Sequence, residues 1–310
     1  MKKYVFIAAL LLCLASCQKE VQPRVYGRYV PERKDDFAWE NEYAAFRMYG
    51  PALANENPSN GVDLWLKNSP ALAIDTMYGR ELKDGRSYHV NYDGNLDCYK
   101  VAHTAGCGGV VILAEAISNQ QSAISNLSIG GPYDRWEILE QTPERFVFRL
   151  EYDSVPVAGQ ILQQSLTITA EAGSLWNKAD VVLTADNSQL STLNSQLYLG
   201  GGIFLHDSID NYRINYATGL IAYAEASVSD MQAAQWNFEY SGSADQGRSY
   251  IAVHTPEATM QQIIDGTLVS LRPYQLGDTL TYYFAACWSQ WSDGTRSFPT
   301  DESWFEAVNE

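Results

Sequence analysis

Hydrophobic and polar residues alternate along several stretches of the chain. In one of them, Phe146, Phe148 and Leu150 are separated by single intervening residues. A period of two places successive side chains on opposite faces, which is typical of a strand with one buried face. Glycine, asparagine, aspartate or proline separate these stretches and favour turns. The expected strands are Glu144–Tyr152, Ile161–Ala170, Leu175–Ala185, Gln235–Tyr240, Arg248–His254 and Leu280–Trp288.

Helical patterns are few and short. Ala71–Tyr78 and Ala258–Asp265 each fit about two helical turns, and Thr300 is a candidate N-cap for a helix through Ser303–Val308. A long chain with many strands and few helices favours two facing antiparallel sheets. The sequence therefore predicts a mostly β fold, a large antiparallel β-sandwich. Because no proline- or serine-rich linker divides the chain, a single domain over residues 31–310 is expected, after a tether over residues 17–30.

The N-terminus has the features of an export signal. Lys2 and Lys3 precede an apolar stretch, and Leu14-Ala15-Ser16-Cys17 matches a bacterial lipobox. The stretch is too short to span a bilayer, so we expect a signal peptide over residues 1–16 and an acylated Cys17 that anchors the protein. The alternative is an ordinary cleaved signal. This pattern predicts a lipoprotein at the periplasm or outer membrane of a Gram-negative bacterium.

The formal net charge is −16. Phosphates would be repelled, so nucleic acid is not an expected partner, and the lipid anchor is the only expected membrane contact. A local arginine cluster would still permit an anionic sugar to bind. Cys98 and Cys107 leave two interpretations open: a short disulfide in an oxidising compartment, or small thiols packed in a turn.

Residues 31–50 combine arginines, carboxylates, an amide and several aromatic rings. Aromatic faces stack on the apolar side of a pyranose, and the polar groups orient its hydroxyls or carboxylate. The sequence thus favours a sugar-binding segment. An edge strand with a charged outer face is the alternative.

Three segments together resemble a known family. They are residues 30–41 with residues 46–50, Gly61-Val62-Asp63-Leu64-Trp65, and Tyr88-His89 followed by Asp97-Cys98-Tyr99 and Gly106-Cys107-Gly108-Gly109. They are similar to the exported domain-of-unknown-function family 4861 of polysaccharide-degrading bacteria, within the galactose-mutarotase-like superfamily. The resemblance implies a β-supersandwich whose concave sheet binds saccharide. It also implies a role in polysaccharide degradation, with dehydration of uronic-acid-containing oligosaccharides in at least part of the family.

Three residues are candidates for proton transfer. If residues 88–93 alternate as a strand, His89 stands beside polar neighbours, where it would be a general base. The alternative is a histidine bonded into a sheet or turn. Tyr99 is a candidate acid, with packing as its alternative. Glu40 would complete the set, or would form the acid and base of a mutarotase together with His89.

The expected substrate-binding residues surround these three. Arg33 and Arg47 would grip a uronate carboxylate and make the adjacent carbon more acidic, as β-elimination requires. The alternative is that they pair with neighbouring carboxylates. The remaining candidates are Asn41 as a neutral donor, Trp39 and Trp65 as stacking surfaces, Asp63, and His206 after a glycine-rich strand.

The preferred function is a carbon–oxygen lyase or dehydratase that acts on a uronate oligosaccharide. One rival is a glycoside hydrolase that uses two of Asp35, Asp36, Glu40 and Asp63. Another is a binding protein without catalysis. No cofactor is expected, and no metal, because Asp93–Asp97 opens like a calcium loop but lacks its later glycine and acid. The lyase hypothesis requires Arg33, Arg47, Asn41, Glu40, His89 and Tyr99 to converge in one cleft.

Overall fold

A computed structural model gives the fold of residues 21–55, 61–118, 121–124, 127–185, 195–206, 211–234 and 242–310. Within these residues, strands form three sheets, and every ladder between the named strands is antiparallel. The predicted mostly β, antiparallel fold is therefore confirmed. The expected signal peptide, Cys17 and the strand expected at residues 235–240 lie outside the described residues.

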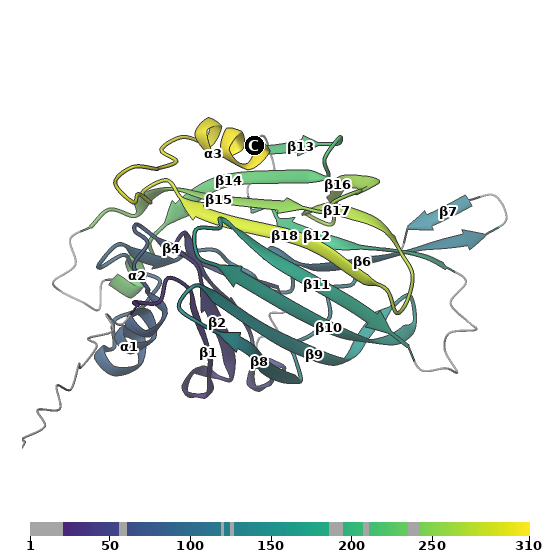
Figure 1. Ribbon diagram of the computed structural model, residues 1–310, viewed down its shortest axis with the longest axis horizontal. Coiled ribbons are helices and arrows are strands. Elements are labelled where there is room, and N and C mark those ends of the chain that lie inside the picture. Colours follow the sequence, from purple (N-terminus) through teal and green to yellow (C-terminus); the bar gives the residue numbers. More distant parts are fainter. Residues whose placement is uncertain are drawn as a thin grey trace, which may run out of the picture.

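The largest sheet has eight strands in the order β13-β14-β15-β18-β11-β10-β9-β8. Their bounds, in that order, are Tyr212–Asn215, Leu220–Val228, Asp245–His254, Thr279–Trp288, Trp176–Thr184, Gln160–Glu171, Arg145–Val157 and Arg135–Gln141. This sheet forms one layer of the molecule (Figure 1). Alternate residues of β11 are buried, as the sequence pattern predicts for a strand with one buried face.

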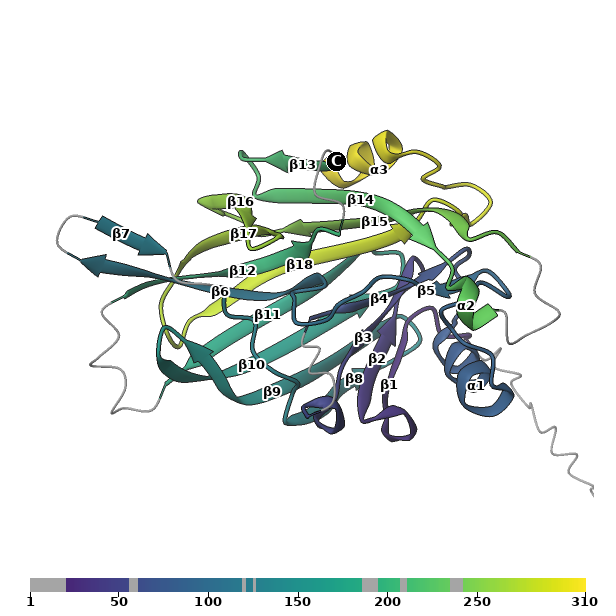
Figure 2. The same cartoon turned by 180° about the vertical axis from the view of Figure 1, so that it is seen from behind.

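Two five-stranded sheets lie on the other side of the large sheet (Figure 2). One has the order β16-β17-β12-β6-β7, with bounds Met260–Ile264, Thr267–Tyr274, Ser195–Phe204, Cys107–Ser118 and Gln121–Ile124. The other, which we call the N-terminal sheet, is β1-β2-β3-β4-β5, with bounds Tyr26–Val30, Asp36–Glu40, Ala44–Met48, Asp63–Lys67 and Asn95–Asp97. Residues 26–30, expected as the end of a tether, thus form an edge strand.

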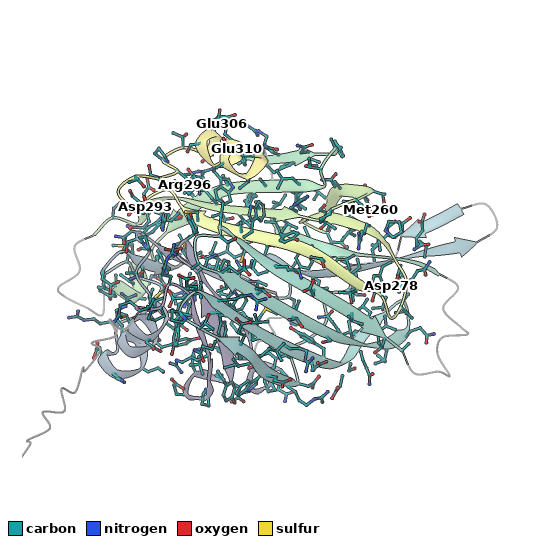
Figure 3. All side chains as sticks on the ribbon, viewed as in Figure 1. Met260, Asp278, Asp293, Arg296, Glu306 and Glu310 are labelled. Atoms are coloured by element: carbon teal, nitrogen blue, oxygen red, sulfur yellow. The ribbon has the colours of Figure 1, made fainter. Side chains whose placement is uncertain are left out.

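One hydrophobic cluster joins all three sheets. It includes Trp39 of the N-terminal sheet, Phe148 and Phe284 of the large sheet, and Leu199 of the third. Trp39 lies 5.0 Å from Phe148 between ring centroids. Side chains fill the space between the layers (Figure 3), and burial of this much apolar surface is the main favourable contribution to folding.

The helices lie outside the sheets. They are α1 (Ile74–Asp84), α2 (Met231–Ala234) and α3 (Asp301–Asn309), with 3₁₀ turns η1 (Pro31–Arg33) and η2 (Pro51–Leu53). Thr300 caps α3 as predicted, because its side chain accepts from the Ser303 amide. Helix α1 begins later and ends later than expected. None of the described helices has the length and apolar character needed to cross a membrane.

The helix expected at Ala258–Asp265 is wrong. Residues 260–264 form β16, which pairs with β17 through a two-residue turn at Asp265 and Gly266. Both turn residues have positive φ, 49° and 74°. An Asp-Gly pair between strands favours this turn because the aspartate tolerates the left-handed region and glycine has no Cβ.

Candidate active site

One face of the N-terminal sheet carries charged residues, although α1 covers it. Strand alternation turns Phe37 and Trp39 into the main core and Asp36, Ala38 and Glu40 toward α1. The same alternation places Arg47, Asp63, Trp65, Lys67 and Asp97 on the α1 side. Register sets Arg47 of β3 opposite Asp63 of β4. Buried charges are costly unless paired, so each needs a partner on this face.

Arg47 is surrounded by carboxylates. Its Nε donates to Oδ2 of Asp63 at 2.9 Å, and its Nη2 lies 3.1 Å from Oδ2 of Asp97. A third carboxylate, Asp36, lies 3.6 Å from Nη1. The guanidinium also packs over the ring of Trp65, 5.0 Å from its centroid. Arg47 is therefore enclosed in structural pairs, and the expectation that it grips a substrate carboxylate does not hold in this structure.

Burial raises the pKa of two carboxyl groups in this cluster, those of Asp36 and Asp97. Burial raises the pKa of Asp36 to about 6, against the opposing effect of Arg47 and Arg33. Burial and the neighbouring Asp63 raise the pKa of Asp97 to about 7. One oxygen of Asp36 and one of Asp63 are buried without a hydrogen bond. Asp36 and Asp97 therefore titrate close to neutral pH.

Tyr88 links this cluster to the surface. Its hydroxyl oxygen accepts from Nε of Arg33 and from Nη1 of Arg47, both at 3.2 Å. Its ring lies 5.0 Å from that of Trp65. Arg47 is buried, whereas Arg33, at the end of η1, is only partly buried. Tyr88 thus holds Arg33, the more accessible of the two cations, against the buried cluster.

His89 is the exposed member of the group, with 46% of its side chain accessible. Its Nδ1 lies 2.9 Å from the backbone carbonyl oxygen of Asp97 and 3.7 Å from Oδ2 of the same residue. A carbonyl oxygen only accepts, so Nδ1 carries the proton and Nε2 of the neutral ring keeps a lone pair. This tautomer suits a general base.

The backbone around His89 is not a strand, so the alternation expected over residues 88–93 is wrong. Tyr88 and His89 lie in a turn, and both contribute to the same group. Asn91 instead donates to Gln246, and Asp93 pairs with Arg80. The His89 carbonyl accepts from the Asp230 amide at 2.9 Å, which ties the turn to the segment before α2.

Glu40 and Asn41 belong to a different part of the sheet. Glu40 pairs with Lys67 at 2.8 Å and accepts from the amides of Ala73 and Ile74, at the start of α1. Asn41 accepts from the amides of Tyr43 and Ala44 and so closes the β2–β3 hairpin. The Glu40 carboxylate therefore stabilises the start of α1, and the Asn41 amide stabilises the hairpin. The expected catalytic role of Glu40 and substrate role of Asn41 have no support here.

The two tryptophans expected to stack on sugar are buried. Trp39 is in the core and donates to Asn177 at 3.1 Å. Trp65 lies under α1, where it donates to Asp63 at 3.2 Å. Neither ring offers a free face, so the stacking role is wrong for both. Asp63 is likewise buried beside Arg47 and is a positioning residue rather than a substrate contact.

Tyr99 and His206 form a separate group, 4.7 Å apart between ring centroids. The Tyr99 hydroxyl is 2.7 Å from the carbonyl oxygen of Phe204, and burial raises its pKa well above the usual value. A buried hydroxyl with that pKa is a poor acid for a substrate. His206 has both nitrogens engaged, with the Lys100 carbonyl and Glu225, each at 2.7 Å. The expected convergence of all six residues therefore fails.

What converges is Arg33, Arg47, Asp63, Trp65 and His89, together with Tyr88, Asp36 and Asp97. Sequence reasoning overlooked Tyr88 because alternation assigned it to the opposite face from His89. The disulfide question is also answered, since Cys98 and Cys107 are free thiols. Among the described residues, no group of three or more histidines, cysteines or carboxylates could hold a metal ion.

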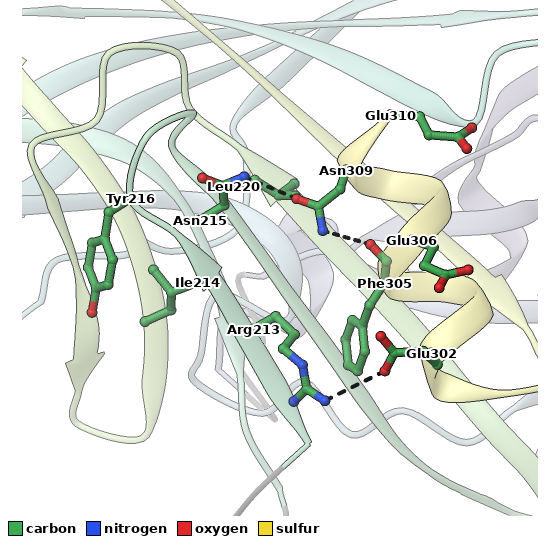
Figure 4. A pocket seen from close by; sticks show the side chains of 10 residues that line it. All are labelled: Arg213, Ile214, Asn215, Tyr216, Leu220, Glu302, Phe305, Glu306, Asn309 and Glu310. Atoms are coloured by element: carbon green, nitrogen blue, oxygen red, sulfur yellow. Dashed lines mark hydrogen bonds and ion pairs between the residues drawn. The ribbon is translucent and has the colours of Figure 1, made fainter.

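An open pocket of about 650 Å³ lies elsewhere, between β13 and α3 (Figure 4). Its polar groups largely bond to one another. Asn215 donates to Asn309 at 3.1 Å, and Arg213 lies over the ring of Phe305, 4.6 Å from its centroid. None of the sequence-predicted site residues lines it. It is therefore a weaker candidate than the His89 group, by which we mean His89, Tyr88, Arg33, Arg47, Trp65 and the carboxylates Asp36, Asp63 and Asp97.

A family comparison covers this site and nearly all of the chain. The family described as "Domain of unknown function (DUF4861)" matches residues 15–310. The chain belongs to the DUF4861 family. All the residues of the His89 group lie within the matched range, so the site is part of the family domain.

The DUF4861 chain also has a curated relative, "Uncharacterized protein P7" of Formosa agariphila. The two are 24% identical over 295 residues, which span 92% of this chain and 66% of the relative. The chain thus spans slightly less than two thirds of the relative's length. Among solved structures, a GH36 α-galactosidase, AgaA of Geobacillus stearothermophilus in complex with raffinose, is similar at a TM-score of 0.32 and 10% identity, over 82% of this chain and 40% of that one.

Proposed function

We infer that the protein acts on an oligosaccharide that contains a uronic acid, and that it eliminates water or a glycosyl group next to the uronate carboxylate. The observation that carries this proposal is the exposed His89 ring, which is fixed through Nδ1 and packs against Tyr88, whose hydroxyl accepts from Arg33. A base and a cation at one surface are the two groups that β-elimination needs.

Arg33 supplies the cation. Its side chain is partly buried and tied to Tyr88 through Nε, and its Nη1 is buried without a hydrogen-bond partner. Pairing with the uronate would neutralise the carboxylate and make the neighbouring C–H bond more acidic. Arg47 acts through Tyr88, because it donates to the same hydroxyl and is itself enclosed. Arg47 is therefore a positioning residue.

His89 moves the proton. In the proposed step, Nε2 takes the proton from the carbon next to the carboxylate, and a carbon–carbon double bond forms. The bond from the next carbon to its oxygen substituent breaks. The imidazolium then returns the proton to that oxygen, which leaves as water or as a sugar hydroxyl. One group serves as base and acid, which the burial of Tyr99 and Glu40 requires.

The choice of a sugar substrate rests on the resemblance to galactose-mutarotase-like proteins and on Arg33, the arginine of residues 31–50 that is only partly buried. The net charge is −16, and an acidic protein does not attract anions by its overall field. A partly buried arginine such as Arg33 is therefore the group that would bind an anionic sugar. A uronate is a sugar that needs such a group.

The test is ultraviolet absorbance. Purified protein incubated with a panel of saturated uronate oligosaccharides should produce a new absorbing double bond, and H89A should lose at least about a hundredfold in rate, the usual contribution of a general base. H103A is the matched control, because His103 is exposed and lies outside the His89 group. Absence of the double bond with every panel member would refute the elimination.

A sugar-binding protein without catalysis is the second candidate. It is favoured by the burial of Tyr99, Glu40 and Arg47, which leaves His89 as the accessible proton-transfer group among the predicted ones. Calorimetry separates the two. Unchanged affinity with lost turnover in H89A supports an enzyme, whereas tight binding by the wild type without turnover on any bound glycan supports the binding protein.

A further inference from the structure

Trp136 is the most exposed of the tryptophans that the structure describes, at 40%. It lies on β8, the edge strand of the large sheet. In both views β8 runs beside β1, the edge strand of the N-terminal sheet (Figures 1 and 2). The edges of two sheets therefore meet here, close to η1, which carries Arg33 at its end.

Trp136 is backed by a fixed ring. It stacks on Tyr29 of β1, with ring centroids 4.9 Å apart and planes 26° apart. The Tyr29 hydroxyl donates to the carboxylate of Asp35, and Tyr133 donates to the Asp35 carbonyl oxygen. An aromatic surface held in this way loses little conformational freedom when a ligand stacks on it.

The same aspartate fixes the position of Arg33. Lys34 and Asp35 both have φ in the left-handed region, 51° and 59°, directly after Arg33. Such a conformation costs free energy in non-glycine residues and persists only when its surroundings enforce it. Gly50 supplies part of that support, because a Cβ there would clash with the Asp35 carbonyl oxygen. Asp35 thus ties the Arg33 turn to the Tyr29–Trp136 stack.

We propose that Trp136, backed by Tyr29, is an aromatic subsite that binds a second sugar ring of the oligosaccharide held by Arg33 and His89. This inference rests on the proposed function and deepens it: the substrate is a chain that extends past the Asp35 turn, not a free monosaccharide. The exposed indole offers the apolar surface that a pyranose ring stacks on.

The charges next to Trp136 favour a sugar over a charged partner. Arg135 pairs with Asp153, and Arg149 of the adjacent strand pairs with Glu137. These pairs leave the strand nearly neutral. Arg33 is the cation next to the turn, so in this proposal the uronate lies there and an uncharged part of the chain lies on Trp136.

The experiment compares W136A with the wild type on short and long members of one uronate oligosaccharide series. For hexasaccharides, W136A should lower kcat/KM between about twofold and tenfold through a higher KM, with kcat unchanged. For disaccharides the two proteins should agree, which also shows that the variant folds. W136F should recover most of the loss, and L139A is the matched control, since Leu139 is exposed on the same strand.

An equal effect of W136A on short and long substrates, or no effect on either, would overturn the subsite. If no substrate turns over, the proposed reaction fails but the subsite is still tested by calorimetry with the same series. Weaker binding of hexasaccharides by W136A, with L139A unchanged, supports it. Failure of the wild type to bind any member, or equal affinities of W136A and the wild type, refutes it.

Discussion

At the residue scale, the candidate site depends on the ion pairs that Arg47 makes. Arg47 is fully committed to Asp63, Asp97 and Asp36, and it supports Tyr88 rather than a substrate. The sequence could not distinguish Arg47 from Arg33, because both lie in the same polar and aromatic run. Burial separates them: position 47 faces α1 within a strand, whereas position 33 ends a turn at the sheet edge.

Asp97 makes stability depend on pH in a direction opposite to that of most carboxylates. Its pKa is raised to about 7 by burial, so between about pH 4 and 7 the folded state binds more protons than the unfolded chain. The free energy of unfolding attributable to Asp97 therefore falls as pH rises through this window.

We expect D97N, which cannot titrate, to flatten that decline by on the order of 4 kcal/mol. Urea unfolding at several pH values measures it. D153N is the control, because Asp153 is exposed and its pKa is lowered by Arg135. If the free energy of unfolding of D97N fell with pH as steeply as that of the wild type, Asp97 would not be the source of the pH dependence.

Gly50 supports the Asp35 turn by having no Cβ. We expect G50A to destabilise the protein by about 2 kcal/mol or more, since overpacking against backbone cannot relax easily. G79A is the matched control, because Gly79 lies within α1 and, apart from its chain neighbours and the helix backbone, no atom lies within 4 Å of the position that an alanine methyl would take. Alanine should therefore stabilise by up to about 1 kcal/mol. Thermal unfolding checks both, and equal effects of the two substitutions would rule out the packing argument.

At the element scale, strands were predictable where alternation was regular, as in β9, β10, β11 and β18. The turn at Asp265 and Gly266 was not recognised in the sequence, so β16 was expected as a helix. The sequence pattern also did not show which polar residues of the candidate site lie close together. Asp36 and Glu40 share a strand face, but four residues of strand separate them by about 13 Å. Glu40 therefore reaches the start of α1 rather than His89.

The sequence suggested a catalytic role for Glu40, but the structure pairs this carboxylate with Lys67 in the interior. Both side chains are fully buried. We expect K67M to cost about 3 kcal/mol or more, because it leaves a buried carboxylate without its cation. K178M breaks the partly exposed pair with Asp180 and should cost about 1 kcal/mol or less. Chemical denaturation measures the loss of stability in K67M and in K178M. Similar losses in the two variants would argue against a structural role for the Glu40–Lys67 pair.

At the scale of the whole molecule, the sheets bring segments from distant parts of the sequence into one core, while the His89 group forms at the border of the N-terminal sheet. Sequence resemblance located this region because its motifs cluster in the first third of the chain. It did not resolve which polar residues face solvent, since that depends on how α1 and the 85–92 turn cover the sheet.

The lipid anchor is a property of the whole chain that stays a prediction. Leu14-Ala15-Ser16-Cys17 should direct acylation of Cys17. C17S should therefore move from the membrane fraction to the soluble fraction in the bacterial host, and immunoblotting of the two fractions measures this. Continued membrane association of C17S would count against the anchor.

In the proposed mechanism, His89 transfers the proton while Arg33 binds the uronate. Its sharpest test is rescue of H89A by free imidazole, read as double-bond formation on a uronate oligosaccharide. We expect added imidazole to restore the rate of H89A in proportion to its concentration and to leave R33A inactive. Wild-type activity in H89A without imidazole would contradict the mechanism.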